Sequence, residues 1–221
     1  MAERFPSLYL VTDRTRTRGR PLIDVVEAAL RGGVDAVQLR EKELPVTGLL
    51  ALACELRDLC RRYGARLLIN DRVDVALAAG AGGAHLPINS FTPADARCLL
   101  GPQALIGASA HSLAEARAAA DGGADFIVFG PVFDTPSKRP FGPPVGLSAL
   151  REVTRNVSLP VLAIGGITAE RVETVRQHGA RGVAVVSAIL EAVDPRAAAT
   201  ALRAHVSVDP EIQPPQHHEA K

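Results

Sequence analysis

Residues Gly32-Gly33-Val34-Asp35-Ala36-Val37-Gln38-Leu39 contain the pattern that decides the fold of this chain. An Ala-rich amphipathic segment ends in glycine and an apolar run follows, which is how the end of a helix leads directly into a strand. The same pattern returns at residues 80–86, 122–129 and 179–186. Its recurrence along the chain predicts repeated helix-to-strand units.

Further apolar runs between these repeats give the complete set of candidate strands, at residues 8–12, 36–39, 66–69, 83–86, 104–107, 125–129, 161–164 and 182–186. Helical patterns alternate with them, near residues 22–31, 46–63, 73–79, 93–100, 112–121, 147–155, 169–178 and 196–205. This alternation predicts a closed parallel (β/α)8 barrel over residues 1–205, with an open doubly wound sheet as the alternative. Residues 206–221 are Pro-rich and polar, and we expect a disordered tail there.

The composition indicates a protein that holds its ligands at a local site. The chain has 221 residues, of which 47% are hydrophobic, enough for a sizeable core. Its 25 Lys and Arg residues balance 24 Asp and Glu residues, so no overall field attracts nucleic acid or an acidic membrane. No segment reaches the roughly 20 apolar residues of a membrane span, and the N-terminus has no apolar signal core. The 3 cysteines lack metal-ligand spacing, and we expect Cys54 and Cys60 to be buried thiols in a cytoplasmic protein.

In such a barrel, functional residues follow the carboxyl ends of the strands. Period-two alternation predicts that Gln38, Arg40 and Lys42 point together into the barrel mouth. Two cations and an amide suit a diphosphate, or a carboxylate next to a polar heterocycle. The alternative is a strand end on the surface, where the cations pair with Glu41 and Glu43.

The loop after the sixth strand is a second candidate for binding an anion. It reads Gly130-Pro131-Val132-Phe133-Asp134-Thr135-Pro136-Ser137-Lys138, and it presents the hydroxyls of Thr135 and Ser137 and the ammonium of Lys138. The alternative is a polar surface loop stiffened by its prolines.

A phosphate site is expected where the seventh and eighth strands end. Gly165 and Gly166 can offer backbone N–H groups beside the start of a helix, and Val186 and Ser187 lie at the end of the last strand. Barrels of this class usually bind phosphate at this position. A Gly-Gly pair also serves a tight turn, which is the alternative.

Three further polar residues follow predicted strands. Asp71, next to Asn70, could bind Mg²⁺, which needs only one or two carboxylates when phosphate oxygens are present, or it could cap the following helix. His111 is the candidate proton shuttle, with a satisfied structural histidine as the alternative. His85 is expected to be structural.

Assembled in this way, the chain resembles the thiamine-phosphate synthase and TenI-like thiazole tautomerase superfamily from Tyr9 to about Ile189. The motifs that carry the resemblance are Tyr9-Leu10-Val11-Thr12-Asp13, Gln38-Leu39-Arg40-Glu41-Lys42, Asn70-Asp71-Arg72-Val73-Asp74, Gly130 through Lys138, Gly142-Pro143-Pro144-Val145-Gly146-Leu147, Ala163-Ile164-Gly165-Gly166-Ile167 and Val186-Ser187-Ala188-Ile189. The resemblance implies a (β/α)8 barrel, a homodimer, and small phosphorylated substrates of thiamine biosynthesis.

For the synthase, the resemblance implies that hydroxymethylpyrimidine diphosphate is coupled to thiazole phosphate with release of pyrophosphate. Asp71 would bind Mg²⁺, Ser109 would lie beside the pyrimidine, and Gly166 and Ser187 would take the thiazole phosphate. The residues implied to hold the pyrimidine diphosphate are Gln38, Arg40, Lys42, Asn70, Thr135, Ser137 and Lys138.

Ser90 departs from the synthase pattern. Synthases typically read His-Leu-Gly-Gln-Glu-Asp where this chain reads His85-Leu86-Pro87-Ile88-Asn89-Ser90, so a second Mg²⁺ carboxylate is replaced by a hydroxyl. Leu86-Pro87 and Phe129 resemble instead the tautomerase branch, in which His111 would shuttle the proton that aromatises thiazole carboxylate phosphate without a metal. A non-catalytic barrel that binds thiazole or thiamine phosphate is a third hypothesis.

The synthase is the leading hypothesis because of the residues that suit a diphosphate. A tautomerase has no diphosphate to hold with Gln38, Arg40 and Lys42, or with the loop that ends at Lys138. A single carboxylate with Asn89, diphosphate oxygens and water could still complete a Mg²⁺ shell.

Overall fold

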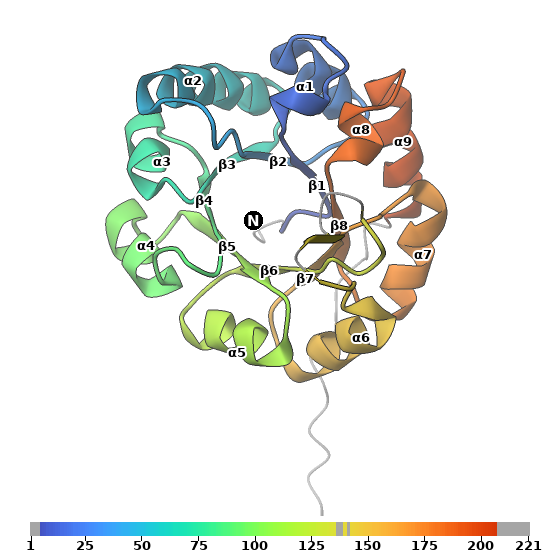
Figure 1. The fold of residues 1–221 in the computed structure, drawn as a ribbon. Coiled ribbons are helices and arrows are strands. Elements are labelled where there is room, and N and C mark those ends of the chain that lie inside the picture. Colours follow the sequence, from blue (N-terminus) through green and yellow to red (C-terminus); the bar gives the residue numbers. More distant parts are fainter. Residues whose placement is uncertain (1–4, 136–138, 141, 207–221) are drawn as a thin grey trace, which may run out of the picture.

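The chain folds into a closed barrel of parallel strands surrounded by helices (Figure 1). The computed structural model describes residues 5–135, 139–140 and 142–206. The strands pair in sequence order, and the last pairs with the first; they are β1 (Leu8–Val11), β2 (Ala36–Leu39), β3 (Arg66–Asn70), β4 (Gly83–Leu86), β5 (Leu105–Ala110), β6 (Phe126–Phe129), β7 (Val161–Ile164) and β8 (Gly182–Val185). The predicted (β/α)8 barrel is confirmed, and the open sheet is excluded.

The helices cover the outside of the barrel, so that the colours of Figure 1 run once around it. They are α1 (Leu22–Arg31), α2 (Val46–Arg62), α3 (Val73–Ala79), α4 (Pro93–Leu100), α5 (Leu113–Asp121), α6 (Gly146–Asn156), α7 (Ala169–Gln177) and α9 (Pro195–His205). Two short elements were not predicted: the 3-10 turn η1 (Arg14–Arg16) after β1 and the helix α8 (Ser187–Leu190) after β8. Three or four residues are too few to show a helical period in the sequence.

The fifth strand extends beyond its predicted end at residue 107. Residues 108–110 are small and have low strand propensity, but they pair with β6, with Ala108 opposite Ile127 and Ala110 opposite Phe129. Tertiary pairing therefore overrides local preference. The extension places Ser109 within β5, and His111 follows it directly.

Asp35, from the first repeat, fastens β1 at the end of the barrel where the strands begin. Its carboxylate accepts hydrogen bonds of 3.1 Å from the backbone N–H groups of Ser7 and Leu8. Arg203 of α9 lies 2.9 Å from the same carboxylate. Because Arg203 belongs to the last helix, this cluster joins the two ends of the barrel sequence.

Asp125, from a later repeat, has the same role four strands further on. It accepts a hydrogen bond of 2.6 Å from the backbone N–H of Ile106 in β5, and Arg97 of α4 lies 2.7 Å away. The other two repeats have Gly82 and Arg181 at this position. Two of the four repeats thus carry a carboxylate that ties a strand to its predecessor.

Two apolar layers fill the molecule. Inside the barrel, the rings of Tyr9 and Phe126 meet edge to face, with centroids 5.6 Å apart, and Leu68 and Leu162 are buried in the same cluster. A larger aliphatic layer lies between the strands and the helices. Burial on both faces explains why the strands are nearly continuous apolar runs.

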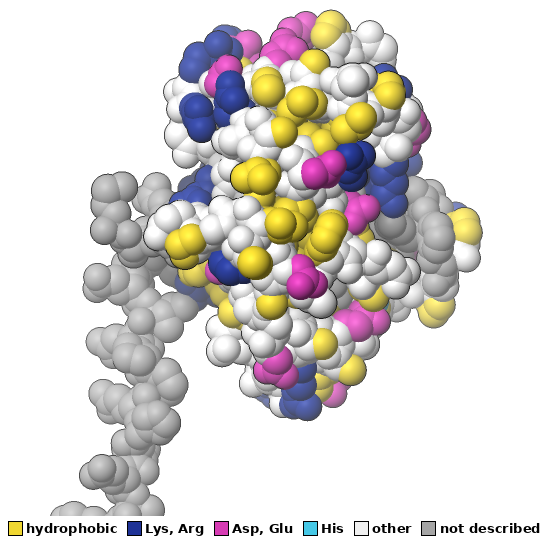
Figure 2. All heavy atoms as spheres, turned by 90° about the vertical axis from the view of Figure 1, so that its left-hand side faces the viewer, with side chains coloured by type: hydrophobic (Ala, Val, Ile, Leu, Met, Phe, Trp, Pro, Cys, Tyr) yellow, Lys and Arg dark blue, Asp and Glu magenta, His cyan; other side chains and the backbone are white. Residues whose placement is uncertain are grey.

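One face of the barrel carries apolar side chains that remain exposed (Figure 2). Leu77 of α3, Phe91 before α4 and Leu99 of α4 are 59%, 50% and 49% exposed. With Asp71 and Arg72 they line a hollow of about 490 Å³. We call Leu77, Phe91 and Leu99 the apolar face.

Other sequence expectations concern the cysteines and the tail. Cys60 is buried in α2, which raises the pKa of its thiol to about 12, whereas Cys54 is half-buried and Cys98 exposed. None of the described helices is long and apolar enough to cross a membrane. Val206 is buried at the end of α9, and the rest of the expected tail lies outside the described residues.

Candidate active site

The loops that follow the strands open at one end of the barrel, which we call the mouth. Parallel strands in a closed barrel have all their carboxyl ends on the same side. The mouth therefore brings together most of the candidate residues, namely Gln38, Arg40, Lys42, Asn70, Asp71, Ser109, His111, Thr135, Gly165, Gly166, Val186 and Ser187. Ser137 and Lys138 lie outside the described residues.

The polar side chains at the end of β2 differ in how deeply they are buried. Gln38 is buried, and its Nε2 donates to the hydroxyl of Tyr9 at 3.3 Å. Arg40 is half-buried, and Lys42 is exposed beside Asn70 and Asp71. No ion pair of these cations with Glu41 or Glu43 occurs within the described part of the chain, so the salt-bridged alternative is not observed.

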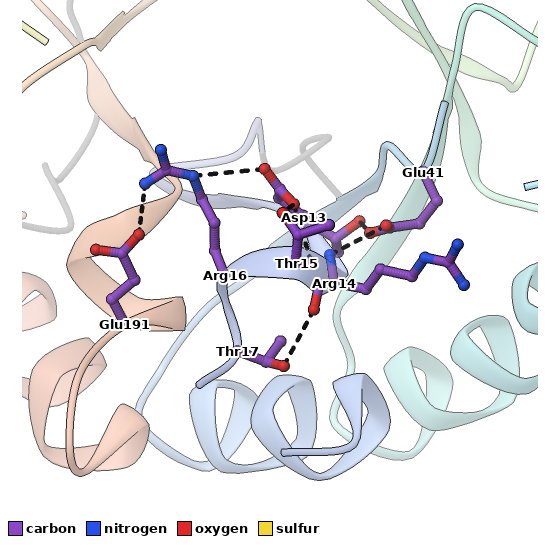
Figure 3. A network of polar contacts seen from close by, with 8 residues as sticks. Asp13, Arg14, Thr15, Arg16, Thr17, Glu41 and Glu191 are labelled. Atoms are coloured by element: carbon purple, nitrogen blue, oxygen red, sulfur yellow. Dashed lines mark hydrogen bonds and ion pairs between the residues drawn. The ribbon is translucent and has the colours of Figure 1, made fainter. Parts of the chain in front are cut away.

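Glu41 instead turns toward the loop after β1 and is buried (Figure 3). The hydroxyl of Thr12 donates to its carboxylate at 2.6 Å, and the backbone N–H of Arg14 donates at 3.0 Å. Burial raises the pKa of Glu41 above the usual carboxyl range, although both hydrogen bonds oppose that shift. The sequence gave no indication that Glu41 is buried and holds the loop after β1. It lies between Arg40 and Lys42, in a pattern that is also typical of an exposed strand end.

The loop after β1 is also held from its other side. Figure 3 shows Arg16 between Asp13 and Glu191, and its guanidinium lies 3.5 Å and 2.5 Å from their carboxylates. Glu191 directly follows α8. The η1 loop is therefore tied to β2 through Glu41 and to the end of α8 through Arg16, which fixes this side of the mouth.

A pocket of about 260 Å³ opens between the ends of β2 and β3. Its polar lining includes Glu41, Lys42, Asn70, Asp71 and Arg72. Asp71 has a left-handed backbone with φ of 65°, and its N–H donates to the carbonyl of His85 at 2.8 Å. Its exposed carboxylate makes no hydrogen bond or ion pair to another described residue. Asp71 is not the N-cap of α3, which is Arg72, so the helix-capping alternative does not hold.

The described residues contain no group of three or more His, Cys, Asp or Glu side chains arranged to hold a metal. Ser90, which replaces the expected second carboxylate, has a buried Oγ without a hydrogen-bond partner there. Among the described residues that line the pocket, Asp71 offers a carboxylate without a hydrogen bond or ion pair. This suits Mg²⁺, which keeps several waters and commonly binds through one carboxylate together with substrate phosphates.

The floor of the mouth is formed by side chains inside the barrel. His85 of β4 is buried, and its Nε2 lies 2.9 Å from the Oγ of Ser109 on β5. Burial is the main cause that lowers the pKa of His85 to about 3, and the charge of Arg40 adds to it. Burial also raises the pKa of Tyr9. Both rings are therefore neutral at physiological pH.

His111 lies at the rim of the mouth. Its Nδ1 donates to the carbonyl of Gly130, so this hydrogen bond fixes the ring and leaves Nε2 as the unprotonated nitrogen of the neutral form. Its backbone N–H donates to the carboxylate of Glu115 at 2.6 Å. The contact with Gly130 links the loop after β5 to the loop after β6.

Gly165 and Gly166 form the turn after β7, with φ of 96° and 64°. A Cβ on Gly165 would lie 2.5 Å from the Cβ of Pro131, and one on Gly166 would lie 2.8 Å from the Cβ of Phe133. Both conformation and space thus require glycine. Ser187 begins α8 beside this turn, which matches the usual phosphate position of the fold.

The turn after β7 is joined to the loop after β6. Val132 donates its N–H to the carbonyl of Ile164 at 2.8 Å, and Phe133 donates to that of Gly165 at 3.1 Å. Arg171 of α7 strengthens the junction, which sequence reasoning missed because no motif marks it. Its guanidinium lies 4.6 Å from the centroid of the Phe133 ring and donates to the carbonyl of Gly166 at 2.6 Å.

Beyond Phe133 the loop is polar. Asp134 pairs with Arg139 at 2.5 Å, and both side chains are exposed. The hydroxyl of Thr135 donates to the carbonyl of Phe133 at 3.0 Å, so its oxygen remains able to accept a further hydrogen bond.

Comparison with known proteins gives one consistent result. A family model described as thiamine monophosphate synthase matches residues 8–189. A thiamine-phosphate synthase of Roseiflexus castenholzii is 47% identical over 203 residues, which cover 90% of this chain and 89% of that protein. A thiamine-phosphate synthase of Methanoculleus marisnigri is 48% identical over 200 residues, covering 90% and 95%. The solved structure of thiamine phosphate pyrophosphorylase from Pyrococcus furiosus matches with a TM-score of 0.83 and 38% identity, covering 90% of this chain and 95% of that one.

Proposed function

The chain belongs to the thiamine monophosphate synthase family and is a thiamine-phosphate synthase, and from this premise we propose how the residues at its mouth perform the coupling. The observation that carries the proposal is the position of two candidate anion sites, one on either side of the neighbouring strands β8 and β1. The pocket with Lys42, Asn70 and Asp71 follows β2 and β3, and the turn of Gly165 and Gly166 follows β7. Two phosphorylated substrates held there would face each other across the mouth.

In this proposal the pyrimidine diphosphate occupies the side of β2 and β3. Arg40 and Lys42 neutralise the diphosphate, while Gln38 and Asn70 supply amide hydrogen bonds. Thr135, Ser137 and Lys138 are assigned to the same group, as the family resemblance implies. Ser109 lies beside the pyrimidine ring.

The thiazole phosphate occupies the other side, at Gly165, Gly166, Val186 and Ser187. The bond between the pyrimidine methylene and the diphosphate oxygen breaks, and pyrophosphate leaves with the bonding electron pair. The lone pair of the thiazole nitrogen then forms the new carbon–nitrogen bond. Cationic side chains aimed at the departing diphosphate stabilise the charge that grows on it, which lowers the barrier.

We propose that Asp71 holds Mg²⁺ together with the diphosphate oxygens. Its free carboxylate at the rim of the pocket fits this role. When bound, Mg²⁺ adds Lewis-acid stabilisation of the leaving group. The side chain of Asn89 can contribute an amide oxygen, and Ser90 contributes at most a hydroxyl.

The two alternative hypotheses rest on Ser90 and His111. Both residues occur in a chain that is 47–48% identical to named synthases along most of its length. The coupling reaction has a diphosphate substrate, which gives the residues suited to a diphosphate a purpose. A tautomerase or a non-catalytic binder of thiazole phosphate has no such substrate. The synthase is therefore the one function proposed.

The proposal is tested by a coupling assay. Purified protein is given both substrates with Mg²⁺, and thiamine phosphate and pyrophosphate are measured. Lys138→Ala is expected to lower kcat by about 100-fold or more, because loss of one donor to a developing anion typically costs that much. Arg181→Ala, an exposed cation at the opposite end of the barrel, is the control and should leave kcat unchanged.

Normal coupling by Lys138→Ala would show that the role given to Lys138 is wrong. A wild-type protein that forms no thiamine phosphate would refute the synthase itself. The non-aromatic thiazole carboxylate phosphate, offered alone, tests the tautomerase, and we expect no aromatic isomer to form.

We also propose that the enzyme works in the cytoplasm as a homodimer, as the family resemblance implies. Free thiols suit a reducing compartment, and the described cysteines are free. The apolar face supports an interface between two copies, since exposed apolar side chains that cluster commonly mark contact surfaces.

A further inference from the structure

His85 is held inside the barrel in one orientation. Its ring packs against those of Tyr9 and Phe126, with centroid distances of 5.9 Å and 6.1 Å. Gly107, its neighbour on β5, leaves the room it needs, because a Cβ there would lie 2.8 Å from Nδ1. The ring is therefore closely surrounded inside the barrel.

The two nitrogens of the ring have different surroundings. Nε2 lies 2.9 Å from the Oγ of Ser109, whereas Nδ1 is buried and has no hydrogen-bond partner within the described chain. A neutral imidazole carries a single N–H. Placed on Nδ1, that N–H would be a buried donor without an acceptor, which is rarer and costlier in proteins than an unused acceptor. The proton therefore belongs on Nε2.

This tautomer determines what Ser109 can do. If Nε2–H donates to the hydroxyl oxygen, the hydroxyl proton of Ser109 must point elsewhere. Ser109 is the next inward-facing residue after Gly107 and lies nearer the mouth, half-buried. The hydroxyl hydrogen of Ser109 can therefore be donated to an acceptor on the side of the mouth, from which a substrate enters.

We propose that His85 is a positioning residue that makes Ser109 a hydrogen-bond donor to the pyrimidine diphosphate. This inference rests on the proposed function, which places Ser109 beside the pyrimidine. His85 itself does not touch the substrate. It accepts no proton during the reaction and acts only by fixing the direction in which Ser109 donates.

Two amide variants separate this role from simple packing. Gln places its terminal nitrogen near the position of Nε2, whereas the shorter Asn places its nitrogen near that of Nδ1 and does not reach Ser109. Both lose the ring. We expect His85→Gln to keep kcat/KM for the pyrimidine diphosphate within a few fold, and His85→Asn to lose about tenfold, as for one lost hydrogen bond. The KM for thiazole phosphate should not change.

The same pair is then made in a Ser109→Ala background. Without the hydroxyl, Gln and Asn should give equal kcat/KM, because nothing remains for the amide to hold. Equal losses in the presence of Ser109, or a difference that persists in its absence, would overturn the inference.

A measurement on the wild-type protein does not depend on whether these variants fold. Long-range ¹H–¹⁵N correlation spectra of protein labelled at histidine report which ring nitrogen carries the proton. We expect the Nε2–H tautomer for His85, whose signals are identified in the wild-type protein by nuclear Overhauser effects to the rings of Tyr9 and Phe126. The Nδ1–H tautomer would overturn the inference whatever the enzyme catalyses, whereas absence of coupling by the wild type would refute the proposed function instead.

Discussion

At the scale of single residues, the mouth combines side chains that are fixed with side chains that are free. Glu41 is buried and bonded on two sides, and it holds the loop after β1 in place. Asp71, on the neighbouring loop, has a free carboxylate. Two carboxylates in adjacent loops thus differ because only one of them meets hydrogen-bond donors of the protein.

Glu41→Gln tests the buried carboxyl. Because burial raises its pKa, the folded protein holds this proton at pH values where the unfolded chain has released it. The stability that Glu41 contributes is present below the ordinary carboxyl pKa and is lost as the pH rises through the raised value. We expect the free energy of unfolding of the Gln variant, relative to wild type, to rise across that interval.

The measurement is urea unfolding followed by circular dichroism, from about pH 4, near the ordinary glutamate pKa, to about pH 7. Glu55→Gln, an exposed carboxyl in α2, is the control and should show no such rise relative to wild type. A constant difference for Glu41→Gln would contradict the expectation.

Residue roles were only partly predictable from the sequence. Strand periodicity gave the inward direction of Gln38, since alternation is a local property. It could not give the burial of Glu41, which depends on donors of the loop after β1. Nor could it find Arg171, whose contacts with Phe133 and Gly166 exist only when two loops meet.

At the scale of elements, the repeated pattern has a structural explanation beyond its glycines. The aspartate that precedes β2 and the one that precedes β6 each accept a backbone hydrogen bond from the strand before. Each is paired with an arginine from a covering helix. The glycine ends the helix, and the aspartate then sets the stagger between two strands.

Asp125→Ala should destabilise the protein by about 2 kcal/mol, the usual worth of hydrogen bonds to a charged group. The change also leaves the Ile106 N–H and the guanidinium of Arg97 without this acceptor. Chemical unfolding checks the value. Asp121→Ala, an exposed carboxylate in α5, is the matched control and should change stability by less than about 0.5 kcal/mol.

The synthase activity of folded Asp125→Ala should be normal, since this residue lies at the end of the barrel away from the mouth. Equal stability of the Asp125 and Asp121 variants would mean that the carboxylate does not fasten the strand.

At the scale of the whole molecule, eight strand-and-helix units were recognisable because apolar runs alternate with helical periods, and four of the units share the glycine pattern. The number of units predicted closure, whereas the register in which β8 pairs with β1 joins residues from opposite ends of the barrel and could not be predicted from local patterns. The short helix α8 was missed for its length. Ser187 is the first residue of α8, so its place at a helix start is known only from the structure.

The proposed dimer is tested by light scattering coupled to gel filtration. Wild-type protein should have twice the mass of one chain. Leu99→Asp, on the apolar face, should shift it toward the monomer, because a charge cannot be buried there without a partner. Val193→Asp, an exposed apolar residue outside that face, is the control and should leave the dimer intact. A monomeric wild type would refute the proposal.

The cluster of Asp35 and Arg203 has a consequence for how this protein is made. The two side chains are 168 positions apart, and Asp35 also holds the first strand. During translation, β1 and β2 leave the ribosome long before Arg203 has been synthesised. The first strand can acquire its full set of contacts only when α9 has been made, so closure of the ring is a late event in folding.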